Sequence, residues 1–185
     1  GEFQKGIDYI GDLKQFEQEL IIHETIALAH DYRLSVHSGS DKFSIFPLLA
    51  KHIGRPFHVK TAGTNWLEAM HVVALTDPSL YRRMHAHALA RFKAATAFYV
   101  VTTDLSKIKP LDKVSDEQLG DYLKDDNARQ LLHITYGYLL QDKDEQGAYL
   151  FRDEFFALLA EEEELYRDLL AKHIGKHFEL LGWKK

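Results

Sequence analysis

The segment Arg33–Ser44, with the sequence RLSVHSGSDKFS, sets the expectations for the rest of the chain. It begins with alternating apolar and polar side chains, which is typical of a β-strand, and continues into a turn of Ser, Gly and Asp. An apolar pattern with helical spacing follows. Loops between a strand and a helix often bind ligands, because strand ends are rigid and helix N-termini present free N–H groups. We therefore expect a functional site in this loop.

The order strand, loop, helix recurs on both sides of this segment. The patterns predict strands at 6–10, 33–37, 57–60 and 97–103, and helices at 13–31, 41–53, 65–76 and 78–95. Such alternation indicates parallel strands joined by right-handed crossovers. Beyond Pro110 the pattern becomes helical, at 115–123, 127–141 and 149–178. The expected fold class is α/β, with a helical C-terminal region.

Polar residues on the strands distinguish two α/β architectures, a doubly wound sheet and half of a (β/α)8 (TIM) barrel. Ser35 and His37 share one face of their strand, and His58 and Lys60 share one face of theirs. A doubly wound sheet should be apolar on both faces, whereas a barrel mouth accepts polar groups, so we expect βα units resembling half of a TIM barrel. Region 4–110 would form the half barrel, with 111–185 packed on it as one domain. We expect the chain to be part of a longer protein and to self-associate through an open sheet edge.

Composition excludes several classes of protein. The 185 residues include no cysteine, which excludes disulfides and zinc–thiolate sites and leaves His, Asp and Glu as metal ligands. The net charge of −5 and the absence of a basic stripe argue against nucleic acid as a partner. No apolar run is long enough to cross a membrane, so we expect a cytoplasmic protein that does not bind membranes.

Five side chains at or just after adjacent strand ends can converge in one cleft, namely His37, Asp41, Lys42, His58 and Lys60. Asp41 is also a plausible helix N-cap. A lysine that points into such a cleft needs a negatively charged partner or substrate, which makes Lys60 a candidate for binding an anion.

The remaining histidines fit ordinary structural roles as well as functional ones. His133 lies one helical turn from Tyr136 in an apolar helix, where a hydrogen-bonded core histidine is the alternative to a catalytic one. His85 and His87 lie on different faces of their helix. His173 and His177 share a face, and we expect them to be a solvated pair.

Three motifs together resemble the tagaturonate epimerase (tagaturonate/fructuronate epimerase) family of bacterial hexuronate catabolism. The motifs are HSGSDKFS at 37–44, FHVKTAGTNWLEA at 57–69 and LHITYG at 132–137. The resemblance extends from about Gly6 to the end of the chain and implies an isomerase that interconverts D-tagaturonate and D-fructuronate. Family members are longer, so this chain corresponds to a C-terminal portion.

The implied substrates differ at a carbon beyond the one next to the ketone, which simple enolisation cannot invert. Retro-aldol cleavage and re-addition would invert it, with a divalent metal ion stabilising the enolate. Oxidation and re-reduction by a nicotinamide is the other route, and the chain lacks the dinucleotide-binding fingerprint that this route needs.

Strand-end position and motif membership assign roles within this chemistry. The expected metal ligands are His37 and His58, and the expected catalytic groups are Lys60, Asp41 and His133. The expected substrate-binding residues are Ser38, Ser40, Lys42, Thr61, Asn65 and Tyr136. Two alternatives remain open, another metal-dependent sugar isomerase or aldolase on a TIM barrel, and a non-catalytic fragment with an incomplete site.

Overall fold

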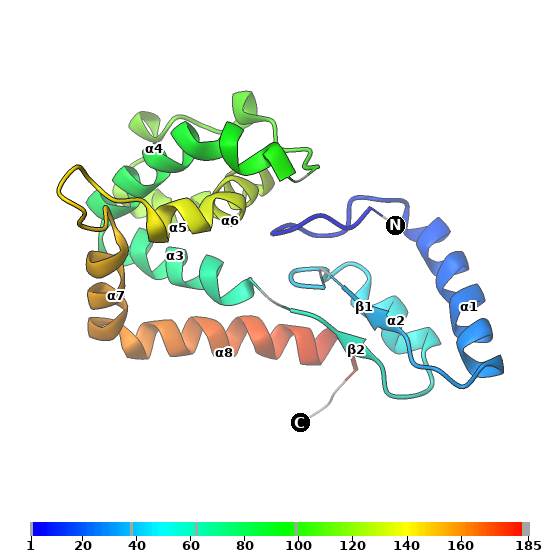
Figure 1. Ribbon diagram of the computed structural model, residues 1–185. Coiled ribbons are helices and arrows are strands. Elements are labelled where there is room, and N and C mark those ends of the chain that lie inside the picture. Colours follow the sequence, from blue (N-terminus) through cyan, green and yellow to red (C-terminus); the bar gives the residue numbers. More distant parts are fainter. Residues whose placement is uncertain (1, 38, 62, 99, 183–185) are drawn as a thin grey trace. The chain divides into compact units, whose positions relative to one another are not determined.

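The computed structural model describes residues 2–37, 39–61, 63–98 and 100–182 (Figure 1). The chain divides into two compact units. Unit 1 comprises residues 1–64 and 171–185, and unit 2 comprises residues 65–170. This division differs from the boundary after residue 110 that the change in sequence character suggested.

Unit 1 is built around one strand–helix–strand segment. Its elements are α1 (Leu13–Ala29), β1 (Ser35–Val36), α2 (Phe46–His52), β2 (His58–Val59) and the end of α8 (Glu163–Leu180). Asp12 caps α1, since its carboxylate accepts a hydrogen bond from the Gln15 N–H at 2.8 Å. The small core combines α1 and α2 side chains with the apolar face of the strands, and includes Phe16, Leu20, Ile45, Phe46, Leu49 and Ile53.

Strands β1 and β2 pair in parallel, with Ser35 opposite His58 and Val36 opposite Val59. The chain crosses from β1 to β2 through α2, as in a βαβ unit (Figure 1). Val36 and Val59 pack against the core of unit 1, while Ser35 and His58 are exposed. The sheet therefore has one apolar face and one polar face.

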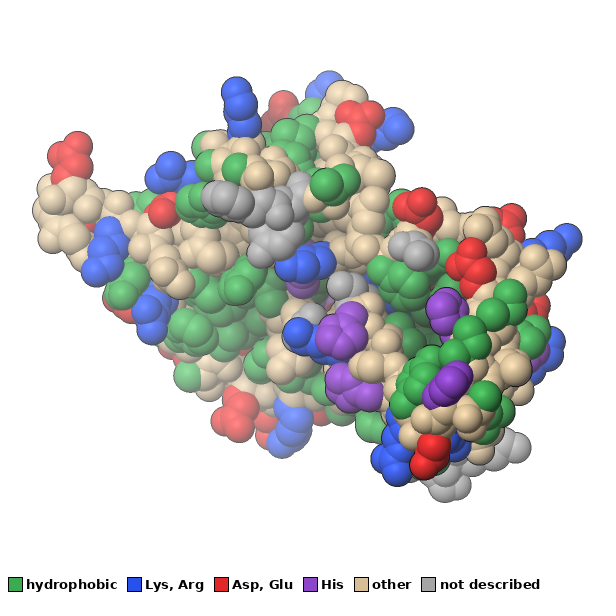
Figure 2. All heavy atoms as spheres, turned by 45° about the vertical axis from the view of Figure 1, so that its right-hand side comes forward, with side chains coloured by type: hydrophobic (Ala, Val, Ile, Leu, Met, Phe, Trp, Pro, Cys, Tyr) green, Lys and Arg blue, Asp and Glu red, His purple; other side chains and the backbone are tan. Residues whose placement is uncertain are grey.

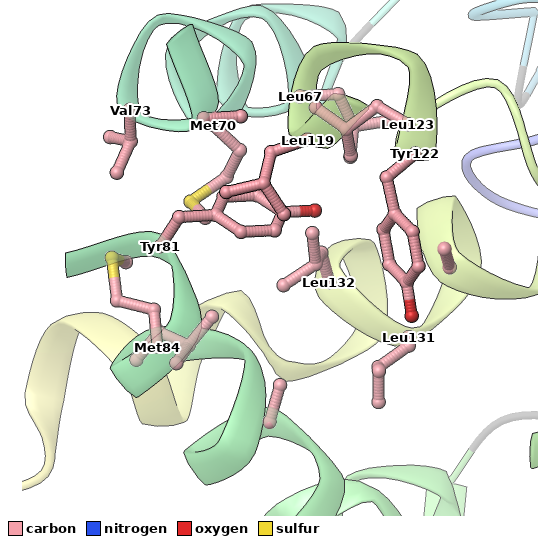
Figure 3. Packing of buried hydrophobic residues seen from close by; sticks show 14 of the residues in the cluster. Leu67, Met70, Val73, Tyr81, Met84, Leu119, Tyr122, Leu123, Leu131 and Leu132 are labelled. Atoms are coloured by element: carbon pink, nitrogen blue, oxygen red, sulfur yellow. The ribbon is translucent and has the colours of Figure 1, made fainter. Parts of the chain in front are cut away.

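Unit 2 is helical. Its elements are α3 (Thr64–Thr76, whose first residue lies in unit 1), α4 (Pro78–Ala95), α5 (Leu119–Tyr122), α6 (Asp126–Gln141), α7 (Arg152–Glu161) and the start of α8. Short 3-10 turns occupy Thr96–Phe98, Leu105–Lys107, Leu111–Lys113 and Asp116–Gln118. Asp77 caps α4 by accepting a hydrogen bond from the Leu80 N–H, and Pro78 occupies the first turn. Tyr81 and Tyr122 lie among the leucine and methionine side chains of the core (Figure 3).

Two of the four predicted strands are wrong. Residues 6–10 form no strand; Asp8 instead anchors its segment to Ser44, accepting a hydrogen bond from the Ser44 hydroxyl at 2.8 Å. In the predicted strand at 97–103, Ala97 and Phe98 belong to a 3-10 turn, residues 100–103 have no regular structure, and Tyr99 lies outside the described residues. A β-rich run forms a strand only beside a partner strand, and neither run has one among the described residues. The described chain is mostly helical, and its two-stranded sheet does not establish a half barrel.

Most of the predicted helices are confirmed, but α2 begins at Phe46 rather than at residue 41, so Asp41 is not its N-cap. Helices α1, α4 and α6 agree with the predictions within a few residues, and the C-terminal third is helical as expected. The helix predicted at 149–178 is two helices, α7 and α8, which are separated at Glu162 within a run of four glutamates. In the part of the chain that the structure describes, no helix combines the length and apolar character needed to cross a bilayer.

Candidate functional site

The polar face of the β1–β2 sheet carries two of the predicted site histidines. The rings of His37 and His58 lie edge to face, with their centroids 6.3 Å apart. Ser35 Oγ lies 2.8 Å from His58 Nδ1, at hydrogen-bonding distance. This contact orients the His58 ring and leaves Nε2 available to a ligand when Nδ1 carries the proton.

Lys60 extends this polar face at the end of β2. Its side chain is exposed, and no ion pair joins it to a described residue. Its backbone is fixed to β1, because the Lys60 N–H donates to the Val36 carbonyl at 2.9 Å and the Gly39 N–H donates to the Lys60 carbonyl at 2.9 Å. The neighbouring Thr61 is also exposed. Lys60 can therefore meet an anion in front of the two histidines.

Gly39 permits the loop after β1 to pass close to β2. A Cβ atom at this position would lie 2.4 Å from a methyl group of Val59 and 3.2 Å from the Lys60 carbonyl oxygen. Any larger residue would push the loop away from β2. The close approach of the loop to β2 therefore explains why the HSGSDKFS motif has a glycine at this position.

Asp41 is held by helix α8 rather than presented to solvent. It is 4% exposed and adopts a left-handed backbone conformation with φ of 62°. Its Oδ1 lies 2.8 Å from His173 Nε2, and its backbone N–H points at His177 Nε2 at 3.5 Å. Burial lowers the pKa of His177. The predicted solvated pair of His173 and His177 is therefore wrong, since both rings pack against the loop and against Phe43.

Lys42 is buried, contrary to its expected exposure to a substrate. Its side chain is fully inaccessible, and its ammonium group donates to the carbonyls of Gln4 at 2.7 Å, Ser40 at 3.3 Å and Ile7. The sequence suggested that Lys42 points into a cleft, because its position just after a strand is the only information that the sequence gives. The structure instead uses the cation to fasten the N-terminal segment to the loop.

The other residues predicted in this loop differ in accessibility. Ser40 is 4% exposed and its carbonyl accepts a hydrogen bond from Lys42. Ser38 lies outside the described residues. The loop therefore presents His37 at its start and buries Ser40, Asp41 and Lys42 behind it.

Unit 2 carries the remaining three predicted site residues. His133 and Tyr136 lie one turn apart on α6, where His133 is partly buried and Tyr136 is 55% exposed. Asn65 is exposed at the start of α3. Trp66 joins these two helices, because its indole N–H donates to the Leu132 carbonyl at 2.9 Å and its ring lies 6.2 Å from that of Tyr136. Tyr136 also lines a surface pocket of about 380 Å³ beside the end of α4.

The strand histidines fit part of a metal site. Two imidazoles on neighbouring strands, one of them oriented by a hydroxyl, are typical metal ligands. Among the described residues, no three His, Asp or Glu side chains gather closely enough to enclose a cation. His37 and His58 can therefore supply two ligands, and a stable site needs further ligands from elsewhere.

Sequence reasoning missed three contributors to this region, namely Ser35, His173 and His177. Ser35 could have been found, because a hydroxyl directly across a parallel pair from a histidine is within hydrogen-bonding reach. The contact of His177 with Asp41 spans 136 positions and leaves no local signal.

The βαβ segment thus carries His37 directly after β1 and His58 at the first position of β2, both on its polar face. Residues 1–181 match the family model described as UxaE, tagaturonate epimerase. The chain belongs to the tagaturonate epimerase family.

Individual relatives agree with this assignment. The chain is 44% identical over 182 residues to the tagaturonate/fructuronate epimerase of Thermotoga maritima. It is 62% identical in sequence to fructuronate-tagaturonate epimerase UxaE from Cohnella laeviribosi. The crystal structure of that enzyme in a complex with one glycerol superposes on this chain with a TM-score of 0.96. A complex of the same enzyme with two glycerols gives a TM-score of 0.97 at 61% identity.

These matches cover nearly all of this chain and a minor part of each relative. The chain spans 37% of the Thermotoga maritima protein, and 98% of the chain is aligned. It covers 37% of the first Cohnella laeviribosi structure and 38% of the second. The fold described above is therefore one portion of a larger family architecture.

Proposed function

We propose that the protein represented by this chain is a sugar-acid epimerase that interconverts D-tagaturonate and D-fructuronate. The family match over residues 1–181 is the observation that carries the proposal. The names of the relatives in Thermotoga maritima and Cohnella laeviribosi support the substrates. The partner is then a small hexuronate, and we retain the expectation of a cytoplasmic enzyme.

The proposed reaction is a retro-aldol cleavage followed by re-addition. The β-hydroxyl loses its proton, the bond between the α and β carbons breaks, and the electron pair moves to the ketone to give an enolate and an aldehyde. The aldehyde turns its other face to the enolate, the bond re-forms and the new alkoxide recovers a proton. Atoms and electrons balance without an oxidant. A bound divalent cation would supply Lewis-acid stabilisation of the developing negative charge.

We assign the cation to His37 and His58, with further ligands from the part of the family polypeptide that this chain does not span. Ser35 would hold the His58 ring in a ligating orientation through the 2.8 Å contact with Nδ1. Lys60 is assigned to the negative charge of the substrate carboxylate or enolate, because its side chain is exposed on the same sheet face.

The remaining assignments concern protons and hydroxyl groups. His133 is proposed to move the proton of the β-hydroxyl, since an imidazole ring can both accept and donate a proton. Thr61, Asn65 and Tyr136 are exposed and suited to hold substrate hydroxyls. Ser38 stays a proposed substrate contact. Ser40, Asp41 and Lys42 are buried, so we propose that they act by shaping the loop.

The test uses a hybrid enzyme in which this chain replaces its matched region in the Cohnella laeviribosi protein, 62% identical to it. NMR of the product should show inversion at one carbon, without net cleavage or carbonyl migration. His37→Ala and His58→Ala should each abolish turnover and lower the bound metal measured by elemental analysis. His30→Ala, which changes an exposed histidine at the end of α1, should do neither.

Two results would reject parts of this proposal. Carbonyl migration or accumulation of cleavage products would favour another metal-dependent sugar isomerase or aldolase. Normal metal content in both histidine variants would show that neither His37 nor His58 is a metal ligand, whatever reaction the enzyme catalyses.

A further inference from the structure

One edge of the β1–β2 sheet is open. The His58 N–H donates to the Leu34 carbonyl at 3.1 Å, and the Lys60 N–H donates to the Val36 carbonyl at 2.9 Å. Because successive residues of a strand direct their backbone groups to opposite edges, the N–H and C=O of Ser35 point away from β2. Within the described residues the sheet holds β1 and β2 and no third strand. The backbone N–H and C=O of Ser35 therefore lie on the open edge of β1, where they can bond to a further strand.

A cavity of about 290 Å³ lies beside this edge. Its lining comes from α1, α2, β1 and the N-terminal segment, and combines the apolar Phe3, Phe16, Leu20, Leu34, Val36 and Leu49 with the polar Glu19, His23 and Ser35. Concave sites lined mostly by apolar side chains are typical places for a ligand or a partner segment to bind. A space of this size next to an unpaired strand, in which most lining side chains are apolar, is suited to hold apolar side chains from outside.

Helix α1, which forms one wall of this cavity, is apolar on more than one side. Leu20 and Ala27 are buried within unit 1, whereas Ile22 and Leu28 are both 58% exposed, and Ile21 is 44% exposed. Exposed apolar side chains that lie close together often mark a site of contact with another segment or protein. Apolar and histidine side chains are exposed close together on the face turned forward in Figure 2.

The occupant of this surface is indicated by the length of the relatives. The chain covers 37% of the Cohnella laeviribosi enzyme and keeps the same fold there, so most of that polypeptide lies outside the matched region. Two strands of two residues each are too few to form an independent sheet. Parallel sheets are normally larger and covered on both faces.

We propose that the edge of β1 at Ser35 receives a β-strand from the part of the family polypeptide that this chain does not span. The strand bonds to the Ser35 N–H and C=O. Its side chains on one face enter the cavity and are apolar, and those on the other face join His37 and His58 on the polar face. This placement does not depend on the reaction proposed above, because it requires no turnover.

The test separates the loss of the backbone donor from the loss of the side chain. Ser35→Pro removes the outward N–H and the hydroxyl, whereas Ser35→Ala removes the hydroxyl alone. Both variants are made in the isolated chain and in the hybrid with the Cohnella laeviribosi enzyme. We expect the proline variant to lower the melting temperature of the hybrid well below that of the alanine variant. In the isolated chain the two variants should melt at similar temperatures.

Hydrogen exchange gives a second readout that needs no substitution. The Ser35 amide should exchange about tenfold more slowly, or better, in the hybrid than in the isolated chain. The residue aligned with Ser35 in the Cohnella laeviribosi enzyme should be protected in the same way, which keeps the test independent of the folding of the hybrid.

Three outcomes would overturn the proposal. Equal effects of proline in both contexts would show that no strand pairs with this edge. Rapid exchange of the aligned amide in the intact Cohnella laeviribosi enzyme would show the same. Dimerisation of the isolated chain that Ser35→Pro abolishes would assign the edge to a second copy instead.

Discussion

Units 1 and 2 bury apolar side chains in different ways. Unit 2 has a large core in which α4 and α6 pack together, with Met84, Leu131 and Leu132 all fully buried (Figure 3). Unit 1 has a small core, and α1 leaves Ile22 and Leu28 exposed. Unit 2 is therefore stable through its own packing, whereas unit 1 depends on polar anchors and presents apolar surface for a further contact.

The largest effect should come from removing a core side chain of unit 2. Leu131→Ala leaves a cavity beneath α6 and should cost about 4 kcal/mol of unfolding free energy, measured by urea denaturation. Ile22→Ala, the matched change on the exposed surface of α1, should cost less than about 0.5 kcal/mol in the isolated chain. Similar costs at the two positions would remove the contrast between the units.

Within unit 1, stability should be most sensitive to substitution of the buried Lys42. Lys42→Met keeps the length of the side chain and removes the donor to the carbonyls of Gln4, Ile7 and Ser40. Unsatisfied buried carbonyls should lower stability by about 3 kcal/mol and release the N-terminal segment to limited proteolysis. Lys51→Met, at an exposed lysine on α2, is the control and should change neither measurement. An unchanged cleavage pattern in Lys42→Met would reject the anchoring role.

Acid should destabilise unit 2 through His85. Burial lowers its pKa from the ordinary 6.5 to about 4, and its Nε2 lies 3.1 Å from the hydroxyl of Tyr122. The unfolded chain binds a proton below pH 6.5 and the folded chain does not until about pH 4, so stability falls between these values. At pH of about 5 the loss should be about 2 kcal/mol.

His85→Leu isolates this contribution, because His177 has a pKa lowered by burial too and acts in the same direction. The unfolding free energy of the original chain minus that of His85→Leu should therefore decrease as the pH falls from about 6.5 to about 4, because only the original chain loses stability through this histidine. A difference that is constant across this range would show that His85 titrates normally.

The smallest effect should be a gain in stability at Tyr81. Its side chain is fully buried and its hydroxyl has no hydrogen-bond partner among the described residues. Burial raises its pKa far above the ordinary value, so the hydroxyl stays protonated. Tyr81→Phe should stabilise unit 2 by about 1 kcal/mol, measured by urea denaturation. Tyr122→Phe should not, because the Tyr122 hydroxyl donates to the Lys109 carbonyl at 2.8 Å.

The sequence predicts helices better than strands for a physical reason. Helix boundaries follow from local signals, and the Asp77–Pro78 pair marks the start of α4 as expected. Strands depend on distant partners. The runs at 6–10 and 97–103 have strand-like composition, yet no described strand lies beside either one.

The candidate site shows the same limit. Alternation along the strands correctly indicated that His37, His58 and Lys60 share the polar side, because this follows from the pleat alone. The burial of Asp41 and Lys42 depends on α8 and on the N-terminal segment, which only tertiary structure brings to the loop.

Native-state hydrogen exchange of the isolated chain tests the contrast between the units most directly. The slowest amides should lie in α4 and α6, with exchange set by global unfolding, while amides of α1, β1 and β2 should exchange through smaller, local openings. Their protection should rise in the hybrid with the Cohnella laeviribosi enzyme. Equal protection of α1 and α6 in the isolated chain would contradict the account, because it would mean that unit 1 is already complete.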